Sequence, residues 1–227
     1  MATLSVSMQG YEIDQHPLGK SVVLHLLPGV LILLVFLVFA PLAAASGLPP
    51  NFALFAAVLL ALIPFELGYM LREGRIRNVR PSLRGVVLNH EHLPLWQYLV
   101  LLPVFTLWLF LGFAVLPPLD GWVKDTFFSW WPSWLDTTAP IGNLPPAVVV
   151  VMVVLGIALA GLAAPIVEEM YFRGYLLPRM SYLKGWAPLV NVVLFALYHL
   201  FTLWLVPTRI TRCCRSSTRC GGRGTST

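Results

Sequence analysis

Long apolar runs with few charges dominate the chain. Five of them are long enough to cross a bilayer as helices, which takes about 20 residues each; they cover residues 22–46, 52–71, 96–117, 146–167 and 187–206. Leu, Val, Ala and Phe make up most of each run, and a lipid-exposed backbone must satisfy its own hydrogen bonds. The pattern predicts an all-α, polytopic transmembrane helical bundle of about five spans.

The composition leads to the same class of protein. Hydrophobic residues make up 58% of the 227 residues and charged residues only 11%, whereas an ordinary soluble domain carries about 25% charged residues. The net charge of +5 does not indicate nucleic-acid binding, because the arginines lie in loops beside the apolar runs, where anionic lipid headgroups are the nearest partners. We therefore expect membrane lipid as a partner and no nucleic acid.

The loops set the expected orientation and boundaries. Residues 1–21 form a polar N-terminal segment, and residues 22–206 form the transmembrane domain. The loop at residues 71–84 carries five arginines against one glutamate, and positively charged loops favour the cytoplasmic side. The N-terminus is then also cytoplasmic.

Aromatic residues gather between the third and fourth apolar runs. They predict an aromatic belt or a short interfacial helix, with burial in the protein core as the alternative. The residues are Trp122, Phe127, Phe128, Trp130, Trp131 and Trp134.

The composition changes abruptly near the end of the chain. Residues 207–227 are rich in Arg, Cys, Ser, Thr and Gly and contain almost no branched aliphatic residues. Such a segment lacks the apolar surface needed to order itself, so we expect an atypical, basic, disordered tail. The abrupt change resembles out-of-frame translation or a truncated gene, and we expect the C-terminus to be incomplete.

The fourth apolar run ends in three charged residues, Glu168, Glu169 and Arg173. Ionisable groups at membrane depth cost several kcal/mol unless they are paired or used. Glu169 and Arg173 stand four residues apart and can pair on one helix face, whereas Glu168 is turned about 100° away. Glu168 is thus a candidate general base. The alternative is that all three side chains mark the membrane boundary by reaching toward water.

The fifth run contains a second titratable group, His199. Phe195 shares its helix face, and Asn191 lies two turns earlier on nearly the same face. Helices joined by a short loop usually pack as neighbours, so we expect Glu168 and His199 to meet. Together they could hold a water for attack on a carbonyl, or supply two ligands to a divalent metal such as zinc. A histidine buried in the core is the alternative.

Three further ionisable residues lie near the ends of the first two runs. Glu66 could line the same cleft or reach the arginine-rich loop, and we favour the second position. His16 and His25 lie at the edge of the first run without an evident partner.

The two motifs resemble those of a known family. Residues 168–173, Glu-Glu-Met-Tyr-Phe-Arg, match an EExxxR motif, and residues 195–199, Phe-Ala-Leu-Tyr-His, match an FxxxH motif. Both are similar to motifs of the CPBP family, the CAAX-protease and bacteriocin-processing intramembrane endopeptidases. The resemblance covers about residues 50–206 and is sharpest over residues 164–204.

The resemblance implies hydrolysis of a peptide or protein substrate within a membrane, here the bacterial inner membrane. By similarity, Glu168 activates water, Glu169 and Arg173 support it, and His199 positions the water or binds a metal, with Phe195 and Asn191 as supporting residues. Eukaryotic members remove the last three residues of prenylated proteins, and several bacterial members are tied to bacteriocin processing or self-immunity. Whether the chemistry is that of a metalloendopeptidase or of a metal-free glutamate enzyme is open.

One part of the family pattern is missing. Family members carry a third motif with a second histidine and usually an asparagine, but no histidine follows His199 and no asparagine follows Asn191. A catalytic zinc normally takes three protein ligands, and the chain offers two obvious ones. We therefore expect weak or absent activity. The alternative function is a non-catalytic membrane binding or bacteriocin self-immunity protein, in which the polar groups lock helices together.

Overall fold

The computed structural model describes residues 5–8, 11–88, 95–137 and 144–199. Its strands are β1 (Ser5–Met8) and β2 (Tyr11–Asp14), which pair antiparallel. Its α-helices are α1 (Leu18–Ala45), α2 (Asn51–Ala57), α3 (Ile63–Asn78), α4 (Leu95–Val115), α5 (Pro117–Phe127), α6 (Pro146–Leu155), α7 (Ala164–Glu168) and α8 (Ala187–Tyr198). Shorter segments are the π-helices η1 (Val58–Leu62), η3 (Gly156–Ala163) and η4 (Glu169–Leu176), and the 3₁₀ segments η2 (Ser133–Leu135) and η5 (Leu177–Trp186).

The all-α prediction is confirmed, apart from a small N-terminal hairpin that the sequence did not predict. Within the described residues, three helical stretches are long and apolar enough to cross a membrane, and they cover Leu18–Ala45, Asn51–Asn78 and Pro146–Tyr198. The predicted count of five spans is not confirmed. Helix α4 occupies most of the third predicted run, and the fifth run continues beyond the described residues. The predicted tail, residues 207–227, also lies outside them.

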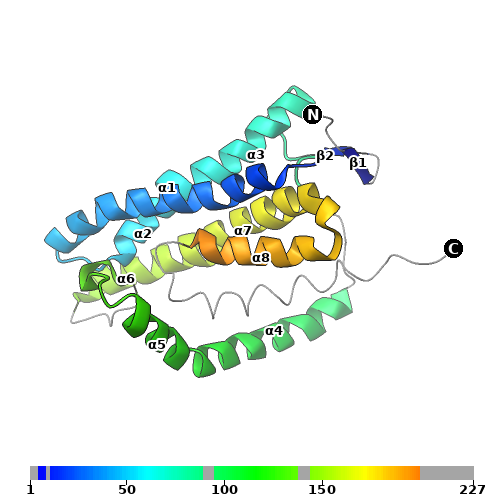
Figure 1. The fold of residues 1–227 in the computed structure, drawn as a ribbon. Coiled ribbons are helices and arrows are strands. Elements are labelled where there is room, and N and C mark those ends of the chain that lie inside the picture. The colour runs from blue at the N-terminus through cyan, green and yellow to red at the C-terminus, as the bar shows by residue number, and fades with distance from the viewer. Residues whose placement is uncertain (1–4, 9–10, 89–94, 138–143, 200–227) are drawn as a thin grey trace.

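The longest of these stretches, Pro146–Tyr198, consists of two helical segments rather than one continuous helix. Backbone angles at Met180 (φ −113°, ψ 18°) and Lys184 (φ 51°, ψ −128°) are not helical, so the chain reverses direction within η5. Helix α8 then runs back against η4 (Figure 1). The fourth and fifth predicted runs are therefore neighbours, as expected for helices joined by a short connection.

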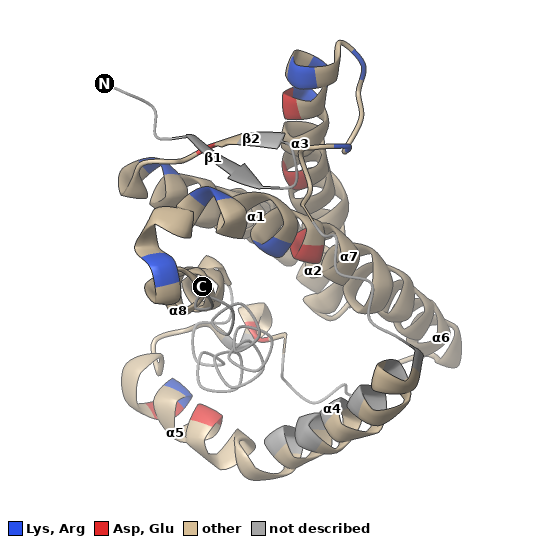
Figure 2. Cartoon of the chain, turned by 90° about the vertical axis from the view of Figure 1, so that its right-hand side faces the viewer, with Lys and Arg blue, Asp and Glu red and all other residues tan. Residues whose placement is uncertain are grey.

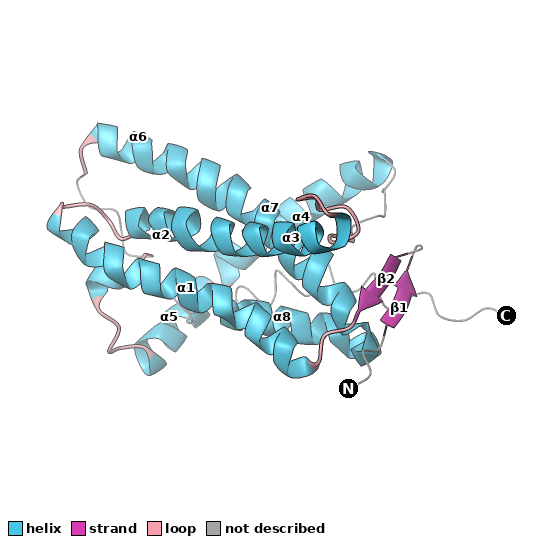
Figure 3. Ribbon diagram, turned by 90° about the horizontal axis from the view of Figure 1, so that it is seen from above, coloured by secondary structure: helices cyan, strands magenta, loops and turns pink. Residues whose placement is uncertain are grey.

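The helices form a body with two peripheral elements. Helices α1, α2, α3, α6, α7 and α8 lie side by side in both side and top views (Figures 1 and 3), and α4 and α5 lie along one side (Figure 2). The rings Trp122, Phe127 and Trp130 are 58%, 59% and 69% exposed. The core alternative is therefore wrong for these three aromatic residues. Lys and Arg gather at the C-terminal end of α3 and in the loop that follows it (Figure 2).

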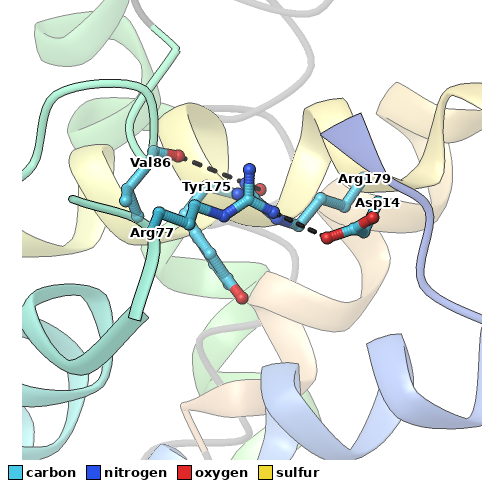
Figure 4. Close-up of polar contacts among 5 residues, drawn as sticks. All are labelled: Asp14, Arg77, Val86, Tyr175 and Arg179. Atoms are coloured by element: carbon cyan, nitrogen blue, oxygen red, sulfur yellow. Dashed lines mark hydrogen bonds and ion pairs between the residues drawn. The ribbon is translucent and has the colours of Figure 1, made fainter. Parts of the chain in front are cut away.

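A buried arginine holds the connection after η4 in place. Arg179 is 1% exposed, and its guanidinium carbon lies 3.8 Å from the centre of the Tyr175 ring. Its Nη1 donates to the carbonyl oxygens of Tyr175, at 2.7 Å, and Val86, at 3.2 Å (Figure 4). These contacts satisfy part of a charge that would otherwise be costly to bury.

The N-terminal segment packs onto this connection. Arg77 of α3 pairs with Asp14 at 2.9 Å (Figure 4). The Gln15 side chain donates to the carbonyl of Pro178, and the backbone N–H of His16 donates to the carbonyl of Arg179 at 2.9 Å. The segment before α1 is thus tied to two elements distant in sequence.

The first prediction concerns His16, whose ring is buried beside Tyr175. Burial, together with the charges of Lys20, Arg179 and Arg77, lowers the pKa of His16 to about 3 from 6.5. A histidine held neutral by folding contributes stability in full above its unfolded pKa, and loses it as the pH falls. We expect protection of the N-terminal amides from hydrogen exchange to decline between pH 6.5 and 3.

The control for this prediction is His16→Gln, which removes the imidazole but leaves Asp14 in place. The difference in protection between the native chain and this variant should change across that pH range. An equal pH dependence in both proteins would contradict the assignment.

Helices α1 and α8 approach closely at Gly29. A Cβ at this position would overlap the backbone carbonyl of Tyr198, whereas a Cβ at Gly19 of the same helix would meet nothing within 4 Å. Small residues allow such close backbone approach between membrane helices. Gly29 therefore sets the distance between α1 and the C-terminal end of α8.

The second prediction is that Gly29→Ala destabilises the protein by about 1–3 kcal/mol, because the added methyl group forces α1 and α8 apart. Unfolding in detergent measures this change. The matched control, Gly19→Ala, should be neutral or slightly stabilising, because alanine is the better helix former. Equal stability of both variants would show that the close approach at Gly29 is unimportant.

Candidate functional site

The EExxxR segment lies where an α-helix becomes a π-helix. Helix α7 has a proline, Pro165, in its first turn and ends at Glu168, and the π-helical segment η4 begins at Glu169. π-Helical turns are rare and occur frequently at functional sites. The two adjacent carboxylates therefore sit on either side of a change in helical geometry.

The predicted pairing of Glu169 with Arg173 is present. Arg173 Nη1 lies 2.6 Å from Glu169 Oε1, and the two side chains are 36% and 48% exposed. Ion pairs this exposed contribute little to stability, typically about 0–1 kcal/mol. The pair therefore has little value as a structural clamp.

Glu168 turns toward α8. Its side chain is half-buried, and its Oε1 accepts a hydrogen bond from the Tyr198 hydroxyl at 3.1 Å. Tyr198 is fully buried at the end of α8. The carboxylate is thus directed into the helical body and toward the residue that precedes His199.

His199 follows the last residue of α8 and is half-buried. Its Nδ1 lies 3.0 Å from the carbonyl oxygen of Phe195. A carbonyl can only accept, so Nδ1 carries the hydrogen and the lone pair of a neutral ring is on Nε2. The rings of Phe195 and Tyr198 pack edge-on against the imidazole, with centroids 4.9 and 4.7 Å away.

A cleft of about 160 Å³ lies between the EExxxR segment and α8. Drug-sized ligand pockets usually hold about 300–1,000 Å³, so this cleft suits water molecules and a short section of chain. Its lining residues are Pro165, Glu168, Glu169, Phe172, Arg173, Asn191, Val192 and Phe195. Five of the six predicted site residues line it. His199 is not among the lining residues and stands next to Tyr198 instead.

Glu66 is a site residue that the sequence reasoning placed wrongly. It is fully buried, and neither of its carboxylate oxygens makes a hydrogen bond of good geometry to a described residue. It nevertheless lies close enough to Glu168 and to the Tyr198 hydroxyl to interact electrostatically with both. Our favoured position at the arginine-rich loop is therefore wrong: Glu66 lies close to Glu168 and Tyr198, although it is not among the residues that line the cleft.

The physical reason is distance along α3. Arg72 is the first arginine after Glu66, and six helical residues span about 9 Å, which is too far for a glutamate that points into the body. The signal in the sequence was the carboxylate itself, because an ionisable residue in an apolar run marks function by default.

His25 has a partner that the sequence did not reveal. Its buried ring places Nε2 3.0 Å from Asn191 Oδ1 and Nδ1 2.6 Å from the carbonyl oxygen of Ser21. Asn191 therefore links α1 to the cleft. The two residues are 166 positions apart, and no pattern in a single sequence indicates their contact.

Few candidate metal ligands gather among the described residues. No three His, Cys, Asp or Glu side chains come together among them, whereas a catalytic zinc takes three protein ligands. Glu168 and His199 remain the two ligands predicted from the sequence. A metal at this position stays a prediction.

Comparison with known proteins supports the motif assignment. Residues 149–213 match the model of a family described as type II CAAX prenyl endopeptidase Rce1-like. This match confirms the resemblance to the CPBP family. The matched CPBP-like segment contains both motifs, covers less than a third of the chain, and extends past the described residues. No curated protein and no solved structure matches the chain.

The third prediction concerns Glu66. A buried polar group whose hydrogen bonds are poorly formed costs about 1–3 kcal/mol, so Glu66→Met should raise the free energy of unfolding by about that amount. Thermal unfolding in detergent measures it. The control, Glu73→Met on the same helix, should change stability by less than about 0.5 kcal/mol. A clear loss of stability in Glu66→Met would mean that the carboxylate supports the fold.

Proposed function

We propose that this protein is an intramembrane endopeptidase of the CAAX-protease type, in which Glu168 activates the attacking water. The observation that carries the proposal is the hydrogen bond from Tyr198 to Glu168, which turns the carboxylate toward α8 and the cleft. The family match supports a protease. The proposed substrate is a peptide or protein whose scissile bond lies near the membrane.

The proposed reaction begins with proton transfer from a water molecule to Glu168. The water oxygen attacks the peptide carbonyl, and Glu168 later gives the proton to the leaving amine. Tyr198 holds the carboxylate in one orientation, and the Glu169–Arg173 pair lies at the exposed side of the cleft. His199, with its lone pair on Nε2, is proposed to orient the water. A bound metal would add polarisation of the carbonyl.

The proposed orientation puts the arginine-rich end of α3 and the N-terminus on the cytoplasmic side of a bacterial inner membrane. The concentration of Lys and Arg at that end supports it (Figure 2), because such charges favour the cytoplasmic side.

A second candidate is a non-catalytic membrane binding or self-immunity protein. Two polar contacts favour it, because Tyr198–Glu168 joins α8 to α7 and His25–Asn191 joins α1 to α8. Interhelical hydrogen bonds and small residues hold helices together in lipid. In this alternative, the cleft would have no chemical role.

The fourth prediction separates the two functions at Glu168. In proteoliposomes supplied with a prenylated Cys-a-a-X peptide, Glu168→Gln should lower the cleavage rate by about 10²–10⁴-fold, because glutamine cannot take a proton from water. Glutamine still accepts the Tyr198 hydrogen bond, so thermal stability should stay nearly unchanged.

The matched control is Glu73→Gln, an acidic residue on α3 outside the cleft, which should cleave at the native rate. If Glu168→Gln loses helix assembly or stability instead of turnover, the scaffold function is favoured. Unchanged cleavage in Glu168→Gln would rule out the proposed base.

A further inference from the structure

We propose that Glu66 is a positioning residue for the candidate base: it holds a proton and donates a hydrogen bond to the hydroxyl oxygen of Tyr198, which directs the Tyr198 hydroxyl at Glu168. The proposal rests on the proposed function, in which Glu168 activates water, and adds a residue to it. Its starting point is a fully buried carboxyl group that the proposed reaction does not use.

Glu66 lies inside the helical body, in the first turn of α3. Helix α3 packs against α7 and η4. The groups that face Glu66 are the carboxylate of Glu168 from α7 and the hydroxyls of Tyr171 from η4 and Tyr198 from α8, and η1 carries no titratable residue. Among the described residues, no lysine, arginine or histidine pairs with it. A negative charge on Glu66 would therefore have no cation to balance it.

The Tyr198 hydroxyl has one proton and two carboxyl neighbours. That proton is directed at Glu168 Oε1, at 3.1 Å, and an ionised carboxylate can only accept a hydrogen bond. If both carboxyl groups were ionised, Glu66 would be a buried charge without a donor, because neither of its oxygens accepts a hydrogen bond of good geometry from a described residue. A carboxyl group that keeps its proton has an O–H to donate, and the Tyr198 oxygen has lone pairs that can accept it.

Burial decides which of the two carboxyl groups holds the proton. Glu66 is fully buried, whereas Glu168 is half-buried and lines the cleft. Two negative charges side by side and away from water are costly, so the single charge is better placed on the group nearer to solvent. Tyr171 does not compete for Glu66, because its hydroxyl donates to the carbonyl of Leu24 at 2.9 Å.

The proton on Glu66 acts on the candidate base through Tyr198. A hydroxyl that accepts one hydrogen bond donates a stronger one, so Glu66 strengthens the contact that holds Glu168 as a carboxylate. During hydrolysis, Glu168 takes a proton from water and later gives it to the leaving amine, while Glu66 keeps its own proton throughout. The acceptor sites of Glu66 stay unused, so the residue can serve the base and still cost stability.

The fifth prediction is that Glu66→Met moves the acidic limb of the kcat/KM profile to higher pH by about 0.5–1 pH unit, because the Glu168 carboxylate loses part of its hydrogen-bonded support. Glu66→Gln keeps a neutral donor of the same shape, so its acidic limb should stay at the native pH. An ionised Glu66 would give a different result, because both variants would then remove a negative charge beside Glu168 and move the limb to lower pH. Cleavage of the prenylated Cys-a-a-X peptide in proteoliposomes, measured across the acidic and neutral range, gives the profile.

The two variants test the donor by their difference. The same limb in both of them, whether native or shifted in either direction, overturns the proposal. Glu66→Met leaves the Glu169–Arg173 pair and His199 in place, so a shift reports on Glu66. The matched control is Glu73→Met, on the same helix but outside the cleft, which should keep the native profile.

Tyr198→Phe tests the link between the two carboxyl groups. It removes the hydroxyl and should move the acidic limb in the same direction as Glu66→Met. Adding Glu66→Met to this variant should move the limb no further, because the two residues act in one chain of hydrogen bonds. A further shift in the double variant overturns the role of Tyr198 as the link.

Infrared difference spectroscopy locates the proton without turnover. A protonated carboxylic acid has a C=O stretch that is separate from the bands of carboxylates. At neutral pH, the difference between the native chain and Glu66→Gln should contain this band. The difference between the native chain and Glu168→Gln should show no net loss of it.

The results keep the two proposals apart. Absence of the band from the native chain, or its loss in Glu168→Gln instead of Glu66→Gln, overturns the proton on Glu66. Cleavage that is independent of Glu168 overturns the proposed function, whereas the infrared bands still decide where the proton lies.

Discussion

The hydrogen bond from Tyr198 to Glu168 is the interaction on which the candidate site depends. It needs the end of α8 to lie beside α7, which in turn needs the reversal of the chain within η5. It also needs Gly29, because any larger residue would push the carbonyl of Tyr198 away from α1. The orientation of one carboxylate is therefore set by three segments far apart in sequence. Such dependence is characteristic of a site built on rigid helices rather than on loops.

The same polar groups hold the helices together and form the cleft. In lipid, the hydrophobic effect gives no drive for helices to associate, so close packing and interhelical hydrogen bonds take its place. Tyr171 donates from η4 to the carbonyl of Leu24 at 2.9 Å, and this contact joins η4 to α1. Glu66 is different, because its buried carboxylate lies beside both the Tyr198 hydroxyl and the carboxylate of Glu168. Its position beside Glu168 favours chemistry over scaffolding.

Patterns over a few residues of the sequence predicted the features that depend on residues close together in the chain. Apolar runs predicted the helices, and the four-residue spacing predicted the Glu169–Arg173 pair. The short connection predicted that η4 and α8 would be neighbours. The contact of His25 with Asn191 depends on tertiary packing across 166 positions, which no local pattern reveals. The position of Glu66 could have been inferred by comparing its distance to Arg72 with the reach of its side chain.

The three carboxylates near the site differ in exposure. Glu169 is 48% exposed beside Arg173, Glu168 is half-buried, and Glu66 is fully buried. The ion pair therefore lies at the open side of the cleft, while the candidate base lies deeper among protein side chains, where electrostatic interactions are screened less. A scaffold would gain nothing from this gradient, because each buried carboxylate adds a desolvation cost. A hydrolase needs this difference in exposure, because water must enter the cleft from one side and be excluded from the interior on the other side.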